Sequence, residues 1–310
     1  MRIPPRARPI VAAVCGLLVA LPACGGSGAR ASCSEGATKR TVQYASISGV
    51  PANLTSLDLH LPAGTGGCTK RPIVVWVHGG AWKDGDKSED MAHKIPLFNN
   101  AGYVFASVNY RLTDDKTDPA HPSPQWPVHD QDAADAVAWI VHHAGEFRGD
   151  VRRVAVLGHS AGGGIVAAMT ADPRYLGKSG LALSSIHCAG SMDGEGYDVV
   201  AGATTAPPEW KPVYLAAFGS DPTVWEEASP IRYVAADKGI ARYFLAAQGI
   251  EWRLQQHAAW YHALQAAHVP VTVLDARSLE HADLTTAVGA PDDTVVTPAL
   301  MDFLAGCFSR

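Results

Sequence analysis

A serine lies at the centre of a short glycine-flanked motif in the middle of the chain. Residues 158–162 read GHSAG, so that a glycine stands two positions to either side of Ser160. The apolar run Val154–Leu157 precedes the motif and the small residues Ala161–Ala171 follow it. This order predicts a strand, a sharp turn and a helix, in which the serine hydroxyl is exposed at the positive end of the helix dipole. The chemistry that such an arrangement could perform is nucleophilic attack by Ser160 on a carbonyl carbon.

A second glycine-rich segment follows an earlier apolar run. Residues 78–82 read HGGAW and come directly after Ile73–Val77. Attack on a carbonyl builds negative charge on its oxygen, and backbone N–H groups aimed at that oxygen stabilise the charge. We assign this role to the amides of Gly79, Gly80 and Ala161, because glycines allow the backbone to approach the reacting group closely.

A general base must reach Ser160 from another part of the chain. We assign His281, which lies in residues 280–284 (EHADL), a short loop after the expected strand Val269–Leu274. The chain has 13 histidines, so the presence of one near a motif decides nothing. His281 is distinguished by its place after the last expected strand and before a helix. For His78 and His159 we expect loop packing and support of the oxyanion loop.

Strands and helices alternate through the rest of the chain, which predicts an α/β fold with a mostly parallel sheet and helices on both faces. Thr41–Ile47 and Ser56–Leu61 are expected to form an antiparallel hairpin before it. One excursion, Gly190–Asp237, is too long for a simple connection and is expected to form a cap above the sheet. The other expected strands are Ile73–Val77, Tyr103–Val108, Val154–Leu157, Leu181–His187, Tyr243–Ala247 and Val269–Leu274, and the expected helices cover residues 88–100, 128–143, 161–171, 254–267 and 298–308.

Together these motifs carry a family resemblance. The pattern HGGxW, then NYRL at residues 109–112, then GHSAGG resembles the hormone-sensitive-lipase-like esterases of the α/β-hydrolase superfamily, and kynurenine-formamidase-like enzymes share the layout. The similarity covers roughly residues 40–305 and is strongest over residues 73–165. It implies an α/β-hydrolase fold of about eight strands, a Ser-His-acid triad and no cofactor. It also implies structural roles for Tyr110, Arg111 and Asp130.

The acid of the triad departs from the family pattern. The family usually places an Asp a few residues after a glycine at the end of the penultimate strand, but residues 247–253 read AQGIEWR. We assign Glu251, the only carboxylate there, because a Glu can also orient an imidazole. Two alternatives stay open. In both, Glu251 pairs with Arg253 or faces solvent: in the first, Asp221, Asp275 or Asp283 substitutes for it, and in the second, the acid is absent.

Three functions follow from these residues. The leading hypothesis is a carboxylic-ester hydrolase acting through an acyl-enzyme on a small-molecule ester. An amidase, formamidase or peptidase could use the same scaffold, and a non-catalytic binding module is a third hypothesis. Met192, Trp210, Tyr214 and Trp225 could form an apolar wall of the pocket. The sequence has no HExxH motif and no CxxC pair, so no metal site is expected.

The first residues have the features of an export signal. Three arginines precede the apolar run Ile10–Ala23, and residues 21–24 (LPAC) resemble a bacterial lipoprotein cleavage box. We therefore expect a signal peptide over residues 1–23, a lipid on Cys24, a flexible tether over residues 24–39 and one hydrolase domain over residues 40–310. Localisation would be the outer face of a bacterial membrane. Ordinary signal cleavage, leaving a secreted protein, is the alternative.

Export would place the remaining cysteines in an oxidising compartment. Cys33, Cys68, Cys188 and Cys307 allow three pairings. We favour Cys33–Cys68, which flank the expected hairpin, and Cys188–Cys307 then follows by elimination. Cys188 lies in an apolar run and could instead be a buried free thiol.

Length and charge exclude other classes. A chain of 310 residues with 47% hydrophobic residues is globular. The net charge of −5 becomes −8 once residues 1–23, which carry three arginines and no acid, are removed. An acidic chain with no basic run is a poor candidate for binding nucleic acid.

Overall fold

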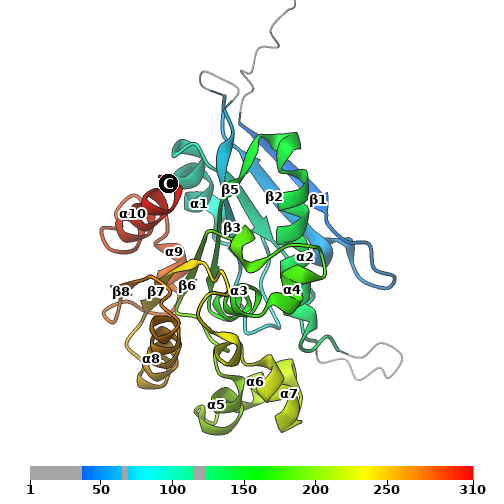
Figure 1. Ribbon diagram of the computed structural model, residues 1–310, viewed down its shortest axis with the longest axis vertical. Coiled ribbons are helices and arrows are strands. Elements are labelled where there is room, and N and C mark those ends of the chain that lie inside the picture. The colour runs from blue at the N-terminus through cyan, green and yellow to red at the C-terminus, as the bar shows by residue number, and fades with distance from the viewer. Residues whose placement is uncertain (1–36, 65–68, 115–122, 310) are drawn as a thin grey trace, which may run out of the picture. The chain divides into compact units, whose positions relative to one another are not determined.

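The computed structural model describes residues 37–64, 69–114 and 123–309. They form an eight-stranded sheet with the order β1-β2-β4-β3-β5-β6-β7-β8 (Figure 1). β2 pairs antiparallel with β1 and with β4, and all other neighbours are parallel. The expected α/β-hydrolase sheet and its antiparallel start are therefore confirmed. The strands are β1 Thr38–Gln43, β2 Ser56–Leu61, β3 Arg71–Val77, β4 Val104–Val108, β5 Gly149–His159, β6 Cys188–Met192, β7 Arg242–Ala247 and β8 Val271–Asp275.

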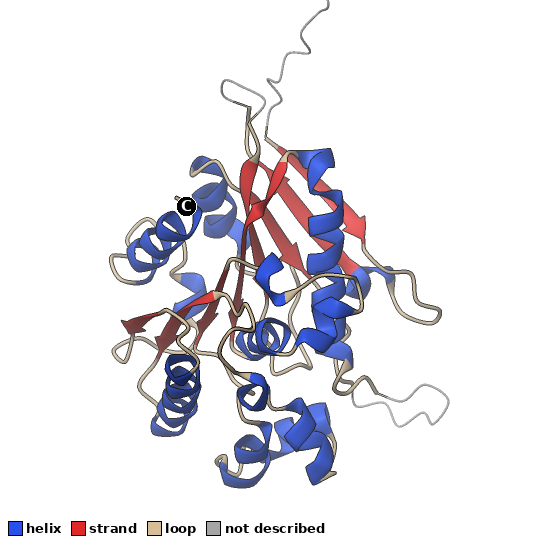
Figure 2. Cartoon of the chain, in the orientation of Figure 1, coloured by secondary structure: helices blue, strands red, loops and turns tan. Residues whose placement is uncertain are grey.

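Helices cover both faces of the sheet (Figure 2). α2, α3, α4 and α8 pack with one core, and α1, α9 and α10 pack with the other. The helices are α1 Met91–Asn100, α2 Val128–His143, α3 Ala161–Ala171, α4 Pro173–Gly177, α5 Val199–Thr205, α6 Lys211–Phe218, α7 Pro222–Ala228, α8 Glu251–Ala266, α9 Asp283–Thr286 and α10 Val296–Phe308.

The sequence of β3 explains the two cores. Successive side chains of a strand point to opposite faces, so a strand between two helical layers must be apolar on both. Ile73, Val75 and Val77 contribute to the core under α2 and α3. Val74 and Trp76 contribute to the core under α1 and α10. Apart from the partly buried Arg71, all residues of β3 are buried.

One expected strand is in the wrong place. Residues 183–185 form a 3-10 turn, and β6 begins only at Cys188. The sequence of β6, CAGSM, has weak strand propensity, and its position is fixed by pairing with β5 and β7 on either side. The space between these strands is narrow, because an ideal Cβ on Gly190 would lie 2.7 Å from Cδ2 of Leu157.

The excursion after β6 contains three short helices, α5, α6 and α7, before the chain returns to β7. These helices lie at the lower end of the sheet in Figure 1, beyond the carboxyl ends of the parallel strands. A disulfide joins Cys188 at the start of β6 to Cys307 in α10. Cys24, Cys33 and Cys68 lie outside the described residues. No helix in the described part of the chain is long and apolar enough to cross a membrane.

Candidate active site

Ser160 occupies a strained turn between β5 and α3. Its backbone φ of 55° and ψ of −126° are unusual for a residue with a side chain, and the surrounding turn must hold it there. Gly162 allows that turn to pack beneath the first glycine loop, because an ideal Cβ on Gly162 would lie 2.3 Å from the Val77 carbonyl oxygen. The GHSAG spacing therefore follows from close backbone packing.

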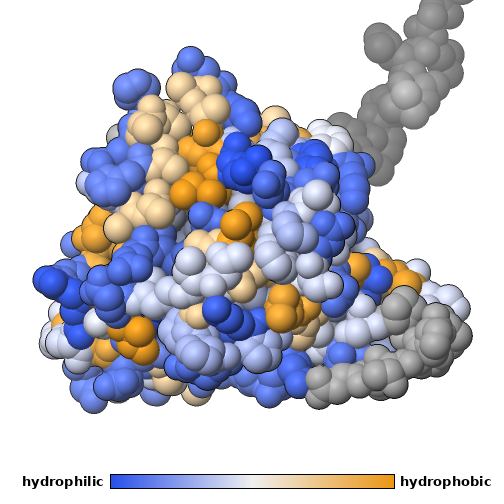
Figure 3. Space-filling view, turned by 90° about the horizontal axis from the view of Figure 1, so that it is seen from below, coloured by the Kyte–Doolittle hydropathy of each residue, from blue (hydrophilic) through white to orange (hydrophobic). Residues whose placement is uncertain are grey.

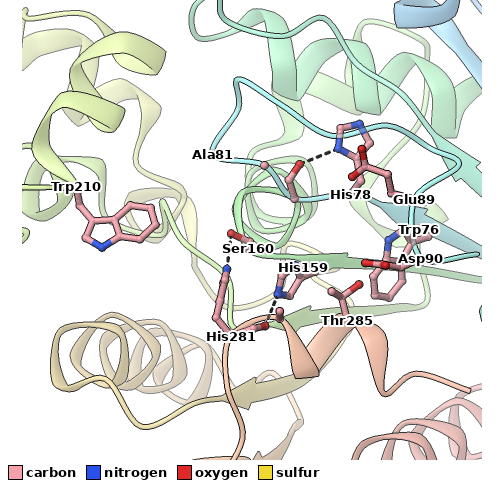
Figure 4. Close-up of a pocket in the computed structure, with 13 residues that line it drawn as sticks. Trp76, His78, Ala81, Glu89, Asp90, His159, Ser160, Trp210, His281 and Thr285 are labelled. Atoms are coloured by element: carbon pink, nitrogen blue, oxygen red, sulfur yellow. Dashed lines mark hydrogen bonds between the residues drawn. The ribbon is translucent and has the colours of Figure 1, made fainter. Parts of the chain in front are cut away.

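The structure brings His281 to Ser160. The Ser160 hydroxyl oxygen lies 3.0 Å from His281 Nε2 (Figure 4). His281 lies between β8 and α9, so the loop after the last strand carries it back over the nucleophile turn. His159 holds this loop in place, since its Nε2 donates to the His281 carbonyl oxygen at 2.8 Å and the centroids of the two tilted rings lie 4.5 Å apart. Burial lowers the pKa of His159 to about 3, so this imidazole is neutral. His159 thus supports the base rather than the oxyanion loop.

The carboxylate beside His281 is Asp193, not Glu251. His281 Nδ1 donates to Asp193 Oδ2 at 2.5 Å. Because a carboxylate only accepts, Nδ1 carries the proton, which leaves Nε2 free to accept from Ser160. Burial alone would raise the pKa of Asp193, but the bond from His281 and the positive charge of Arg253 bring it below its usual value. Asp193 follows β6, and its side chain is fully buried.

The assignment of Glu251 is therefore wrong. Glu251 is the first residue of α8, where its carboxylate is exposed and accepts from Gln255 Nε2 at 2.9 Å. A loop residue could turn towards His281, but the early start of α8 fixes Glu251 at the surface. The other three carboxylates do not replace it. Asp221 caps α7, Asp275 pairs with Arg277, and Asp283 accepts from the amide of Glu280.

The glycine loop after β3 lies against the nucleophile. An ideal Cβ on Gly79 would lie 3.0 Å from Cβ of Ser160. In the described part of the chain, the amides of Gly79 and Gly80 donate no hydrogen bond. Ala161 is the first residue of α3, so its amide also has no partner within the helix. Three free N–H groups are thus available around Ser160, as the oxyanion assignment requires.

His78 and Tyr110 hold this loop. The two rings stack at 4.5 Å, and the Tyr110 hydroxyl donates to the His78 carbonyl oxygen at 3.1 Å. His78 Nδ1 lies 2.8 Å from the Gly79 carbonyl oxygen. This contact and the stacked ring fix the direction of the peptide units that follow.

A cleft of about 330 Å³ opens at Ser160. Trp210 from the insertion stands at one end, while Glu89, Asp90 and Thr285 line the other (Figure 4). Of the four residues expected to form an apolar wall, only Trp210 lines it. Met192 and Tyr214 are buried in the cores, and Trp225 donates from its indole to the Gly219 carbonyl oxygen. Figure 3 shows the molecule from below, where apolar patches are small and separated by polar surface.

Solved structures share this architecture. Esterase B from Lactobacillus Rhamnosis matches with a TM-score of 0.69, 17% identity and coverage of 89% of this chain and 86% of that one. A truncated carbohydrate esterase from gut microbiota matches with a TM-score of 0.69, 19% identity and coverage of 90% and 98%. Both likenesses cover about nine tenths of this chain. The chain has the α/β-hydrolase fold.

The matches in sequence cover only part of this chain. The family model described as BD-FAE matches residues 57–179. Carboxylesterase NlhH from Mycobacterium tuberculosis is 37% identical over 108 residues, which are 34% of this chain and 31% of that protein. The matches span about a quarter to a third of the length of the curated relatives. The matched family segment includes Ser160 and ends before Asp193 and His281.

Asp193 had a signal in the sequence that the misplaced strand concealed. Asp193 directly follows β6, and residues after the carboxyl ends of parallel strands are where active-site groups gather. With the strand expected over Leu181–His187, Asp193 fell six residues beyond its end, within the excursion Gly190–Asp237. Arg253 and Glu195, which also surround the site, had no such signal. Among the described residues no group of three or more His, Cys, Asp or Glu side chains could hold a metal ion.

Proposed function

We propose that this α/β-hydrolase cleaves carboxylic esters with Ser160 as nucleophile, His281 as general base and Asp193 as the acid that orients it. The observation that carries the proposal is the unbroken chain of contacts from Asp193 Oδ2 through His281 to Ser160 Oγ, at 2.5 and 3.0 Å. The curated relatives that match part of its sequence include a carboxylesterase, and the structural neighbours include esterases.

The geometry performs the reaction in two halves. His281 Nε2 takes the hydroxyl proton as Ser160 Oγ attacks the ester carbonyl, and Asp193 stabilises the imidazolium that forms. The amides of Gly79, Gly80 and Ala161 stabilise the oxyanion. His281 then returns the proton to the leaving alcohol, which leaves an acyl group on Ser160. Water, deprotonated by His281, repeats the attack and frees the acid.

A fluorophosphonate probe and short p-nitrophenyl esters test this proposal directly. The wild-type protein should be labelled and should hydrolyse the esters, while Ser160→Ala should lose both properties. Absence of labelling and of hydrolysis in the folded wild type would overturn the proposal. Release of p-nitroaniline from matched anilides, with no ester cleavage, would favour the amidase alternative instead.

We also propose that the chain is exported and anchored by a lipid on Cys24. The basic start, the apolar run Ile10–Ala23 and the LPAC box support it. The Cys188–Cys307 disulfide adds support, because such bonds persist in oxidising compartments. Cys24→Ser should move the protein from the membrane fraction to the soluble fraction. If it stays with membranes, the lipid anchor is wrong.

A further inference from the structure

Four ionisable side chains are buried beside the triad histidine. Asp193 and Glu195 come from the loop after β6, and Arg253 and His257 come from α8. All four are at most 5% exposed. Burial lowers the pKa of His257 to about 4, so this ring is neutral when the enzyme works near pH 7. The charge of this set then rests on Asp193, Arg253 and Glu195, and although burial raises the pKa of Glu195, the adjacent guanidinium of Arg253 acts to lower it and favours the carboxylate.

Arg253 contacts both carboxylates. Its Nη1 lies 3.4 Å from Asp193 Oδ2, the same oxygen that accepts from His281. Its Nη2 lies 2.5 Å from Glu195 Oε1. The guanidinium also stacks over Trp210, with a distance of 4.9 Å to the ring centroid. Arg253 and His281 therefore contact the same oxygen of Asp193, and Arg253 also contacts Trp210 at one end of the cleft.

Glu195 has no task in the proton relay. Its Oε1 lies 3.4 Å from Ser160 Oγ, farther than His281 Nε2 at 3.0 Å. Its Oε2 is buried and accepts no hydrogen bond from the described residues. A buried carboxylate is costly even when it is partly paired, and replacing such an ion pair by apolar groups often leaves a protein equally stable. The free energy of folding therefore does not explain why a buried carboxylate occupies position 195.

We propose that Glu195 and Arg253 are positioning residues that set the net charge around His281, and thereby the pH at which it can act as a base. The inference rests on the proposed function of Ser160 and His281. With both residues charged, the buried set of Asp193, Glu195 and Arg253 carries one negative charge. That charge balances the imidazolium that forms when Ser160 gives up its proton.

The other charged and titratable groups near His281 come from four directions. Glu280 and Asp283 flank it in the chain and are exposed. The tilted ring of His159 from β5 lies against it, His257 from α8 lies behind Asp193, and Lys94 from α1 donates to the Thr285 carbonyl oxygen nearby. Glu89 and Asp90 line the other end of the cleft. Glu195 and Arg253 differ from all of these, because they are buried, charged and in contact with the triad itself.

The net charge of Asp193, Glu195 and Arg253 predicts opposite effects on His281 for two variants. Glu195→Gln leaves Asp193 and Arg253 balanced at zero, so the imidazolium is less favoured and His281 becomes an active base at lower pH. The double variant Glu195→Gln/Arg253→Met restores one net negative charge, since only Asp193 remains charged. Arg253→Met alone is less informative, because Glu195 could then take up a proton and cancel the change.

The experiment measures the rate of fluorophosphonate inactivation and kcat/KM for p-nitrophenyl acetate between pH 4 and pH 9. We expect the acid limb of both profiles to move down by about two pH units in Glu195→Gln, the size of a unit-charge effect over about 6–7 Å at an effective dielectric near 20. The double variant should return the limb towards its wild-type position. Glu251→Gln, the same change on the exposed start of α8, should leave it in place.

The outcomes separate the two proposals. An inert wild type overturns the proposed function. An active wild type whose acid limb stays within about 0.3 units in Glu195→Gln overturns the charge-setting role, as does a double variant that keeps the shifted limb. If the double variant fails to fold, as judged by circular dichroism, Glu195→Gln alone decides.

Discussion

The two sides of the active site are built in different ways. On the nucleophile side, Ser160 and the free amides of Gly79 and Gly80 come from short motifs directly after β5 and β3, which are adjacent in the sheet. On the acid side, Asp193 follows β6, Arg253 comes from α8, and His281 lies 88 residues beyond the Asp193 it contacts. Local sequence therefore specifies one side, while tertiary packing specifies the other.

Gly164 is where the two sides meet, and its substitution should have a large effect on both stability and activity. An ideal Cβ at this position in α3 would lie 1.8 Å from the Glu195 carbonyl oxygen, so the loop that carries Asp193 would have to move. We expect Gly164→Ala to lower the free energy of unfolding by about 3 kcal/mol and to reduce kcat by at least about 100-fold. Thermal unfolding and ester hydrolysis measure the two effects.

Gly177→Ala is the matched control. Gly177 also lies in a helix, but nothing is within 4 Å of the Cβ that alanine would add. This variant should keep wild-type stability and activity. If Gly164→Ala behaves like it, the close approach between α3 and the acid loop does not hold the site together.

His159 joins the nucleophile turn to the His281 loop through one hydrogen bond, and its loss should have a smaller effect. His159→Phe keeps an aromatic ring against His281 but removes the donor to the His281 carbonyl oxygen. One such bond contributes about 1–1.5 kcal/mol, so kcat/KM should fall about tenfold.

His143→Phe provides the comparison for that change. His143 also contacts a backbone carbonyl, that of Trp139, and stacks on a ring at 4.2 Å, but it lies at the end of α2. Its substitution should leave kcat/KM unchanged. Equal losses in the two variants would mean that His159 acts through general stability rather than through His281.

The smallest expected effect is on the pH dependence of stability. Burial lowers the pKa of His129 and His159 to about 3 and that of His257 to about 4. Each of these buried, neutral histidines contributes fully to the stability of the folded state above a pH of about 6.5, which is its pKa in the unfolded chain. This contribution to stability is lost as the pH falls below that value. Burial raises the pKa of Asp130 to about 8, so its contribution has the opposite sign and is lost as pH rises from about 4 to 8.

Between pH 4.5 and pH 6.5 the three histidines stabilise the folded state as pH rises, while Asp130 alone has the opposite effect. The melting temperature should therefore rise with pH. Above pH 6.5 only Asp130 titrates among these four, and the melting temperature should fall slightly. His257→Phe on the acid side should reduce the rise, since the unfolded chain then takes up one proton fewer over this range. His142→Phe on the exposed surface of α2 should not change it. A melting temperature that is flat from pH 4.5 to pH 6.5 would contradict the neutral burial of these histidines.

The same contrast explains what the sequence could predict. α2 and α3 match their expected ranges, because apolar periodicity and small residues specify them locally. Ser160 and the glycine loop were predicted because each motif directly follows a buried strand. Asp193 was missed because β6 is a strand of small residues whose position depends on its neighbours β5 and β7. Glu251 was chosen because the sequence did not show that α8 begins at that residue.

The central claim is that Asp193 has replaced the expected carboxylate after β7 as the triad acid. The most direct test compares kcat for p-nitrophenyl acetate in Asp193→Asn and Glu251→Gln, with folding of each checked by circular dichroism. We predict that Asp193→Asn lowers kcat by about 10⁴-fold, as expected when the imidazole loses its orienting carboxylate, while Glu251→Gln keeps the wild-type value. A folded Asp193→Asn variant with wild-type kcat, or a large loss in Glu251→Gln, would contradict it.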